Sequence, residues 1–164
     1  MRMKDVVVVT GATGHVGQDL VQRLLSVGQT VRAVARNVDR LKPLCARGAE
    51  MWPGSLADPA LLTSVFRGAT AVFAVIPQAN LSAQDPFAEH TRYAQSLVGA
   101  IRAASVTHVV GLSSWGAELP GKAAGAIAPL HVFEDLLDNV PRLNVVHLRP
   151  GHFMENRLYD IGLI

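Results

Sequence analysis

A glycine-rich segment near the N-terminus carries the clearest chemical signal in this sequence. Residues 10–17 read Thr-Gly-Ala-Thr-Gly-His-Val-Gly and follow a run of valines. Glycines at this spacing, between a buried strand and an amphipathic helix, are typical of a loop whose backbone N–H groups bind a pyrophosphate. Gly11 would allow the tight turn, Gly14 the close approach of the phosphates and Gly17 the packing of the helix on the sheet. Alternatively, the three glycines only make a tight connection between strand and helix.

The residue at the end of the next predicted strand indicates which dinucleotide would bind. An NAD-binding domain usually has an acid there, which accepts hydrogen bonds from the ribose hydroxyls. This sequence has Arg36, and a guanidinium can donate two hydrogen bonds to a 2′-phosphate that a carboxylate would repel. We therefore predict NADP(H) as the cofactor, with NAD(H) as the second choice. Arg36 could instead be a solvated charge at a strand end, and we expect the nearest acid, Asp39, to cap the following helix.

Strand and helix patterns alternate along the whole chain and would position these residues. β-branched and apolar runs predict strands over residues 5–10, 30–35, 48–52, 69–76, 107–112 and 144–148. Helical patterns occupy 14–27, 38–46, 59–66, a long segment from Pro86, and 130–139, with loops over 78–85 and 113–129. Six strands joined by right-handed helical crossovers predict an α/β fold, a Rossmann doubly wound parallel sheet in the order 3-2-1-4-5-6 with helices on both faces. Ligands would bind between the first and fourth strands.

Composition and charge exclude several classes of protein. The 164 residues carry a formal net charge of +2 and no cluster of Lys and Arg, so we expect no nucleic-acid partner. No stretch approaches the roughly 18 apolar residues of a membrane span, and the run from Val6 to Val9 is too short for a signal peptide. The single cysteine, Cys45, excludes an intramolecular disulfide, and the histidines lack metal-ligand spacing. We expect a cytoplasmic protein without a membrane segment or a bound metal.

Five segments of the sequence resemble the NmrA-like family of atypical short-chain dehydrogenases/reductases. They are the glycine loop, residues 31–37, Gly54-Ser55-Leu56-Ala57-Asp58, residues 109–114, and the tail Leu-Arg-Pro-Gly-His-Phe-Met-Glu-Asn over 148–156. The resemblance extends over nearly the whole chain. It implies a Rossmann fold, NADP(H) binding, and either reductase activity on quinone- or flavin-type acceptors or a redox-sensing regulatory role.

The resemblance also implies roles for individual residues. The pyrophosphate cradle would consist of Gly11, Thr13, Gly14, His15, Val16 and Gly17, with Arg36 on the 2′-phosphate. The ribose on the adenosine side would be bordered by Ile76 and Pro77. The residues near the nicotinamide would be Ser113, Pro150 and Gly151. The substrate side would be lined by Phe153 and Met154.

Two features depart from the family pattern. Many relatives have an acid that contacts adenine after the third strand, where this sequence has Ser55, so the adenine contact would be weaker or come from the backbone. The chain also ends at Ile164, where relatives continue into a portion that closes the substrate pocket. We therefore expect residues 1–164 to form a single NAD(P)-binding domain without that cap.

Candidate catalytic residues are few. Short-chain dehydrogenases generally use a Tyr-x-x-x-Lys pair, but neither Tyr93 nor Tyr159 has a lysine four residues later. His131 is the best remaining proton donor, because histidine titrates near neutral pH. Ser113 or Ser114 could orient a substrate carbonyl. Alternatively, His131 is a surface residue at the start of a helix, and the serines satisfy backbone groups at a strand end.

We expect an NADP(H)-dependent oxidoreductase that transfers hydride to a small quinone-like or carbonyl acceptor, because the nicotinamide itself carries the difficult chemistry. The alternative is a non-catalytic redox sensor that reports the state of the dinucleotide to a protein partner, which the missing Tyr–Lys pair favours. An uncapped pocket would leave Trp115, Phe153 and Met154 facing water. We therefore also expect a homo-oligomer that associates through this C-terminal face.

Overall fold

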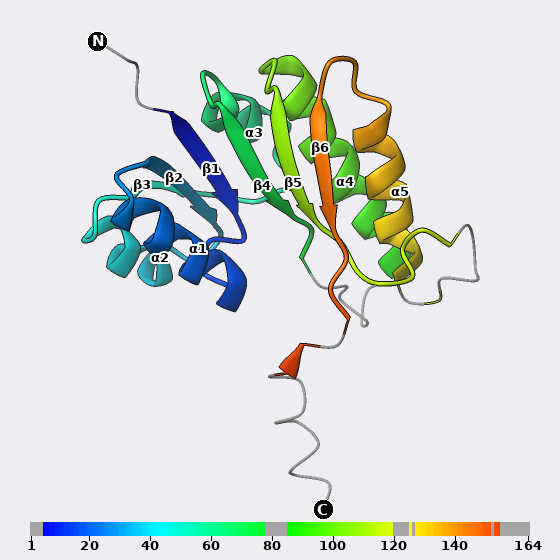
Figure 1. Ribbon diagram of the computed structural model, residues 1–164, viewed down its shortest axis with the longest axis horizontal. Coiled ribbons are helices and arrows are strands. Elements are labelled where there is room, and N and C mark those ends of the chain that lie inside the picture. The colour runs from blue at the N-terminus through cyan, green and yellow to red at the C-terminus, as the bar shows by residue number, and fades with distance from the viewer. Residues whose placement is uncertain (1–4, 78–84, 120–124, 126, 152, 155–164) are drawn as a thin grey trace, which may run out of the picture.

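The computed structural model describes residues 5–77, 85–119, 125, 127–151 and 153–154. Its strands form one parallel sheet in the order β3-β2-β1-β4-β5-β6 (Figure 1). They are β1 (Val6–Thr10), β2 (Thr30–Ala35), β3 (Glu50–Pro53), β4 (Ala71–Val75), β5 (His108–Leu112) and β6 (Asn144–Leu148). The predicted Rossmann sheet and its strand order are confirmed.

Helices cover both faces of the sheet. They are α1 (His15–Ser26), α2 (Val38–Cys45), α3 (Pro59–Phe66), α4 (Pro86–Ala103) and α5 (Ala128–Asp138). In Figure 1, α1 and α2 lie on the near face, over β1 to β3, whereas α3, α4 and α5 lie on the far face. No helix in the described part of the chain is long and apolar enough to cross a membrane.

The hydrophobic core has two parts, one on each face of the sheet. Successive strand residues point to opposite faces, so Val8 of β1 joins one cluster and Val9 joins the other. The cluster under α3, α4 and α5 contains Phe66 and Phe133, both fully buried. The cluster under α1 and α2 is smaller and contains Leu41. Because β1 is buried on both faces, the loop that follows it rests on a rigid base.

Short polar side chains and glycine mark the helix ends. The side chain of Asp58 caps α3 by accepting hydrogen bonds from two backbone N–H groups at 3.0 Å, and Gly28 follows the end of α1 with φ +79°. The predicted cap of α2 is wrong. Asn37 accepts the capping hydrogen bond from the N–H of Arg40 at 3.1 Å, because it precedes the helix in an extended conformation. Asp39 already lies in the first turn of α2 and forms an ion pair with Lys42 at 2.7 Å.

Several element boundaries differ from the prediction by one or two residues, and the structure shows the cause of two of these differences. The third strand starts at Glu50 instead of residue 48, because Gly48 has φ +105° and the N–H of Ala49 bonds to the carbonyl of Leu44 at 3.1 Å. These residues therefore close the end of α2. Helix α5 starts at Ala128, inside the predicted loop 113–129, with a proline in its first turn, where no intrahelical N–H bond is needed. The predicted loop over 78–85 lies outside the described residues, apart from its last one.

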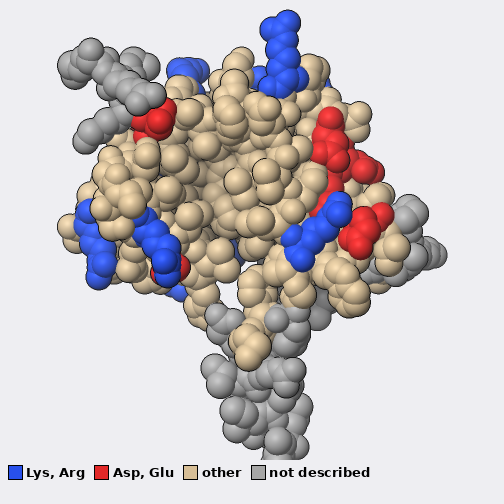
Figure 2. Space-filling view, viewed as in Figure 1, with Lys and Arg blue, Asp and Glu red and all other residues tan. Residues whose placement is uncertain are grey.

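The near face of the sheet is covered only in part. Over β4, β5 and β6 no helix of the described residues is present, and Phe73, Val110 and Val146 lie side by side there in register (Figure 1). Val146 is 55% exposed and Leu148 is 44% exposed. Figure 2 shows this face as a broad uncharged area with Lys, Arg, Asp and Glu at its margins. A cavity of about 720 Å³ lies between this area and α1, and Phe153 is part of its lining.

Candidate dinucleotide-binding site

The glycine loop joins β1 to α1 in a conformation that depends on its glycines. Gly11 has φ +62°, a left-handed conformation that glycine adopts without strain, and its carbonyl accepts the N–H of Gly14 at 2.9 Å. A Cβ on Gly17 would overlap the Gly11 carbonyl oxygen and lie 2.9 Å from the carbonyl carbon. The glycine loop and the first turn of α1 therefore fit together only because Gly11 and Gly17 have no side chain.

The first turn of α1 offers free N–H groups to an anion. The N-cap residue, Gly14, has no side chain that could accept a hydrogen bond from them, and the first turn contains no acidic residue. His15 and Val16, the first two residues of α1, are exposed. These N–H groups and the positive end of the helix dipole are suited to phosphate oxygens. The structure thus brings the predicted cradle residues together at one helix end.

Contacts from three other elements hold the loop in place. The N–H of Ala12 donates to the carbonyl of Val34 in β2 at 3.1 Å. The Arg40 guanidinium in α2 donates to the carbonyl of Thr13 through Nη2 at 2.6 Å. Thr10 is fully buried, and its hydroxyl accepts the N–H of Val75 in β4 at 2.8 Å. The sequence analysis missed Arg40 and Thr10. The position of Arg40, in the first turn of the predicted helix that follows Arg36, was the available signal for the first.

A cavity of about 130 Å³ lies beside the loop, at the carboxyl ends of β1 to β4. Its lining includes four residues predicted from the sequence, namely Gly11, Thr13, Arg36 and Pro77. Further lining residues are Val34, Ala35, Gly54, Ser55, Leu56, Val75 and Tyr93. Ile76 does not belong to it, because its side chain is buried in the core on the far face. This position is the switch point of the sheet, where doubly wound folds bind their ligands.

Arg36 is exposed at the rim of this cavity. Among the described residues, no carboxylate forms an ion pair with it, whereas Arg32 on the same strand pairs with Glu50 at 3.0 Å. Ser55, where the family resemblance led us to expect an acid, lines the cavity, and its hydroxyl oxygen accepts the N–H of Ala57 at 3.1 Å. The rim therefore presents to the cavity a guanidinium that has no ion-pair partner among the described residues.

A second group of predicted residues meets at the carboxyl ends of β5 and β6. The N–H of Ser113 donates to the carbonyl of Leu148 at 2.7 Å, and the N–H of Trp115 donates to the carbonyl of Pro150 at 2.9 Å. The two segments after these strands therefore run side by side. The Ser113 side chain is buried and Gly151 is exposed. Ser113, Pro150 and Gly151, predicted to lie near the nicotinamide, are thus close to one another.

The predicted substrate residues are exposed. Trp115 and Met154 are each 76% exposed, and Phe153 is 38% exposed. Ser114 is half-buried, and among the described residues its hydroxyl donates only to the neighbouring carbonyl of Trp115 at 3.4 Å. The side chains of Trp115, Phe153 and Met154 are therefore accessible to solvent.

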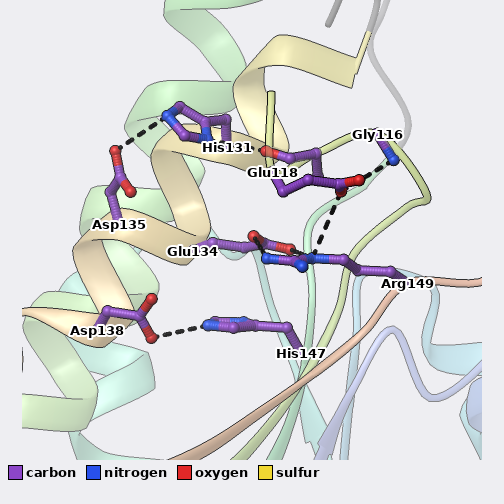
Figure 3. Close-up of polar contacts among 9 residues, drawn as sticks. Gly116, Glu118, His131, Glu134, Asp135, Asp138, His147 and Arg149 are labelled. Atoms are coloured by element: carbon purple, nitrogen blue, oxygen red, sulfur yellow. Dashed lines mark hydrogen bonds and ion pairs between the residues drawn. The ribbon is translucent and has the colours of Figure 1, made fainter. Parts of the chain in front are cut away.

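His131, the predicted proton donor, has contacts on both ring nitrogens. Nδ1 lies 2.8 Å from the carbonyl oxygen of Ala117, to which it donates, and Nε2 lies 3.4 Å from a carboxylate oxygen of Asp135 (Figure 3). The imidazole therefore connects α5 to the loop after β5. Its catalytic role stays a prediction.

An ion pair between a buried carboxylate and an arginine that is 38% exposed lies beside this histidine. Glu134 of α5 is only 3% exposed and accepts two hydrogen bonds from Arg149, from Nε at 2.9 Å and from Nη2 at 2.6 Å (Figure 3). Burial raises the pKa of Glu134, but the hydrogen bonds from Arg149, the nearby Ser113 side chain and the charges of His147 and Arg149 outweigh it and lower the pKa below its ordinary value. Neither Glu134 nor Arg149 was among the site residues predicted from the sequence.

Known proteins share this fold and part of this sequence. Dihydroflavonol 4-reductase of Hordeum vulgare is 41% identical over 91 residues, which are 51% of this chain and 26% of that protein. NAD(P)H azoreductase of Xenophilus azovorans is 25% identical over 158 residues, 93% of this chain and 50% of that protein. An NADPH-dependent quinone oxidoreductase of Escherichia coli, solved with NADPH, has a TM-score of 0.75 at 22% identity and covers 96% of this chain and 53% of its own.

The chain thus spans between 26% and 50% of the length of these curated relatives. The profile of the NmrA-like family matches residues 3–118, a region that contains the glycine loop, Arg36 and the first five strands. That match covers well over half of the chain, and the protein belongs to the NmrA-like family.

Proposed function

We propose that this protein binds NADP(H) at the carboxyl edge of its sheet and reduces a small quinone-like or carbonyl acceptor. The observation that carries the proposal is the position of Arg36, exposed and without a described ion-pair partner, at the rim of a cavity that the glycine loop also lines. A cation at this point complements a 2′-phosphate. The printed names of the relatives, an NAD(P)H azoreductase and an NADPH-dependent quinone oxidoreductase, also support it.

Each part of the site has a role in this proposal. The first N–H groups of α1 would bind the pyrophosphate, and Arg36 would donate to the 2′-phosphate. Ser113, Pro150 and Gly151 would flank the nicotinamide end. When bound, the nicotinamide supplies the hydride. The protein's contribution is then to hold the cofactor in place and to leave one side open to the acceptor.

The surroundings of His131 bear on the class of acceptor. Its Nδ1 is held by a backbone carbonyl and its Nε2 faces a carboxylate, so neither nitrogen points freely toward a substrate. Without a strong acid nearby, the site is better suited to an acceptor that stabilises its own negative charge, such as a quinone. Simple ketones should react slowly. The contacts of His131 also favour the second candidate function, a redox sensor that binds NADP(H) without turnover.

The test is the Arg36→Ala variant, with Arg47→Ala as the matched control. Arg47 is exposed, and among the described residues its side chain contacts only Gln22, at 3.2 Å. Its substitution therefore removes the same charge from another part of the surface. By calorimetric titration, Arg36→Ala should weaken NADPH binding by about 1.5–3 kcal/mol, which is roughly 10- to 150-fold, because it removes charge-assisted hydrogen bonds. NADH binding and the control should be nearly unchanged.

Two results would contradict the proposal at different points. Equal losses for NADPH and NADH would mean that Arg36 is structural and does not select the phosphorylated cofactor. NADPH oxidation would also be followed with a panel of quinones. Tight binding without turnover would exclude the reductase and support the sensor.

A further inference from the structure

An ion-pair cluster joins three segments at the proposed nicotinamide end of the site. Arg149 follows β6, Glu134 lies on α5, and Glu118 lies in the loop after β5. Arg149 makes its two hydrogen bonds to Glu134, and its Nε lies 3.9 Å from Oε2 of Glu118. Glu118 in turn accepts the N–H of Gly116 at 3.1 Å (Figure 3). The cluster therefore links the ends of β5 and β6 to each other and to the helix behind them.

The pair of Glu134 and Arg149 differs from the exposed ion pairs within α1 and α2. Asp19–Arg23 and Asp39–Lys42 have both side chains more than half exposed and join neighbouring turns of one helix. Such pairs contribute little. The Glu134 side chain is 4% exposed, and its partner is 15 residues away in the sequence. A buried carboxylate must keep its partner, and two parallel hydrogen bonds also fix the orientation of the guanidinium.

The position of Arg149 connects this pair to the site. Arg149 directly precedes Pro150 and Gly151, and the carbonyl of Pro150 accepts the N–H of Trp115. The buried Ser113 hydroxyl has no hydrogen-bond partner of good geometry among the described residues, although Ser113 helps to stabilise the charge of Glu134. Fixing the guanidinium thus fixes the backbone that follows it and the serine beside it.

We propose that Arg149 and Glu134 are positioning residues that hold the Ser113 and Pro150–Gly151 segments at the spacing required by the nicotinamide half of the cofactor. They act through these segments and do not touch the cofactor. This inference rests on the proposed function, since it assumes that NADP(H) occupies the site. It predicts that the two halves of the cofactor respond differently to the loss of the pair, because the adenosine half lies at the other end of the sheet edge, by Arg36.

The experiment compares an adenosine-half probe, 2′,5′-ADP, with whole NADPH. The variants are Glu134→Gln, Arg149→Met, the double variant and the conservative Arg149→Lys. Asp138→Asn is the control, because it removes the charge from another contact between α5 and β6, that of Asp138 with His147 at 2.8 Å. Dissociation constants would be measured by titration, and the fluorescence anisotropy of bound NADPH would report the mobility of its nicotinamide.

We expect the variants to bind 2′,5′-ADP within about twofold of the wild type but NADPH roughly tenfold more weakly, with a lower nicotinamide anisotropy. Arg149→Lys should recover part of the loss, and Asp138→Asn should have no effect. The double variant keeps the test valid if a single variant is unstable, because it leaves no unpaired buried charge. A double variant that folds and binds NADPH like the wild type would overturn the inference, and so would equal losses for both ligands. If the wild type binds neither ligand, the proposed function fails as well.

Discussion

Replacing Gly17 with alanine would test how closely α1 packs against the glycine loop. The added Cβ would overlap the carbonyl oxygen of Gly11 and lie 2.9 Å from its carbonyl carbon and 3.0 Å from the Cα of Ala12. All three atoms belong to the backbone, and Ala12 is hydrogen-bonded to Val34 of β2. They cannot rotate away as a flexible side chain would. Either the loop or the start of α1 must therefore move.

The size of the effect follows from two opposing terms. Overpacking costs about 1–3 kcal/mol, and the rigid neighbours place Gly17→Ala near the upper end, at about 3 kcal/mol. Alanine recovers about 1 kcal/mol, because it loses less conformational entropy than glycine when a helix forms. The net loss is about 2 kcal/mol. For a domain of this size, each 1 kcal/mol shifts Tm by about 2–4 °C, so Tm should fall by roughly 4–8 °C.

Thermal melts with and without NADPH would measure this, with two other glycines as controls. Gly99 lies in the middle of α4 with nothing within 4 Å of an added Cβ, so Gly99→Ala should raise Tm by about 1–4 °C. Gly14 has an ordinary φ of −77°, and its Cβ would meet only the Gly11 carbonyl oxygen, at 3.3 Å. Gly14→Ala should therefore fold nearly normally but lose the stabilisation by NADPH. A Gly17→Ala variant that melts at or above the wild type would refute the close-packing argument.

Two further predictions concern charge and association. Because the pKa of Glu134 is lowered in the folded protein, its stabilisation is present above the ordinary value of 4.5 and is lost as the pH falls through the lowered value. Urea unfolding at pH 7 and pH 3 should show the stability gap between the wild type and Glu134→Gln shrinking in acid, and a constant gap would contradict this. We also propose that the exposed apolar surface around Val146, Leu148 and Trp115 mediates self-association. Sedimentation velocity at several concentrations should show an oligomer that Val146→Lys disrupts, whereas a wild type that is monomeric throughout would disprove it.

The parts of the fold that could be predicted depend on local patterns and general rules. The valines of β1, followed by glycines at 11, 14 and 17, indicate a strand, a tight turn and a helix within a few residues. The strand order follows from the handedness of parallel crossovers, which does not depend on particular side chains. The position of Arg36 beside the cavity could also be predicted, because it directly follows the end of a strand. The cap of α2 was predicted wrongly as Asp39, because the start of the helix was not located closely enough to show that Asn37 precedes it.

The other end of the site depends on contacts that no local pattern encodes. Arg149 donates to Glu134, which is 15 residues away in the sequence, and His131 donates to the carbonyl of Ala117, which is 14 residues away. Each of these side chains, read by itself, is equally consistent with a solvated surface residue. Only the packing of α5 beside β6 brings them together. The sequence therefore showed that Ser113 and Pro150 follow neighbouring strands but not what holds them.

The two ends of the candidate site are thus maintained by different interactions. At the adenosine end, glycines without side chains, backbone hydrogen bonds and the buried Thr10 hydroxyl fix the loop, and none of these groups titrates in the physiological range. At the proposed nicotinamide end, the buried Glu134 carboxylate accepts two hydrogen bonds from Arg149, and this interaction depends on the charge of both groups. The first end leaves no room for a side chain at Gly17, whereas the second end depends on a pair of opposite charges. Substitutions that add volume should therefore impair cofactor anchoring, and substitutions that remove charge should impair the placement of the reactive ring.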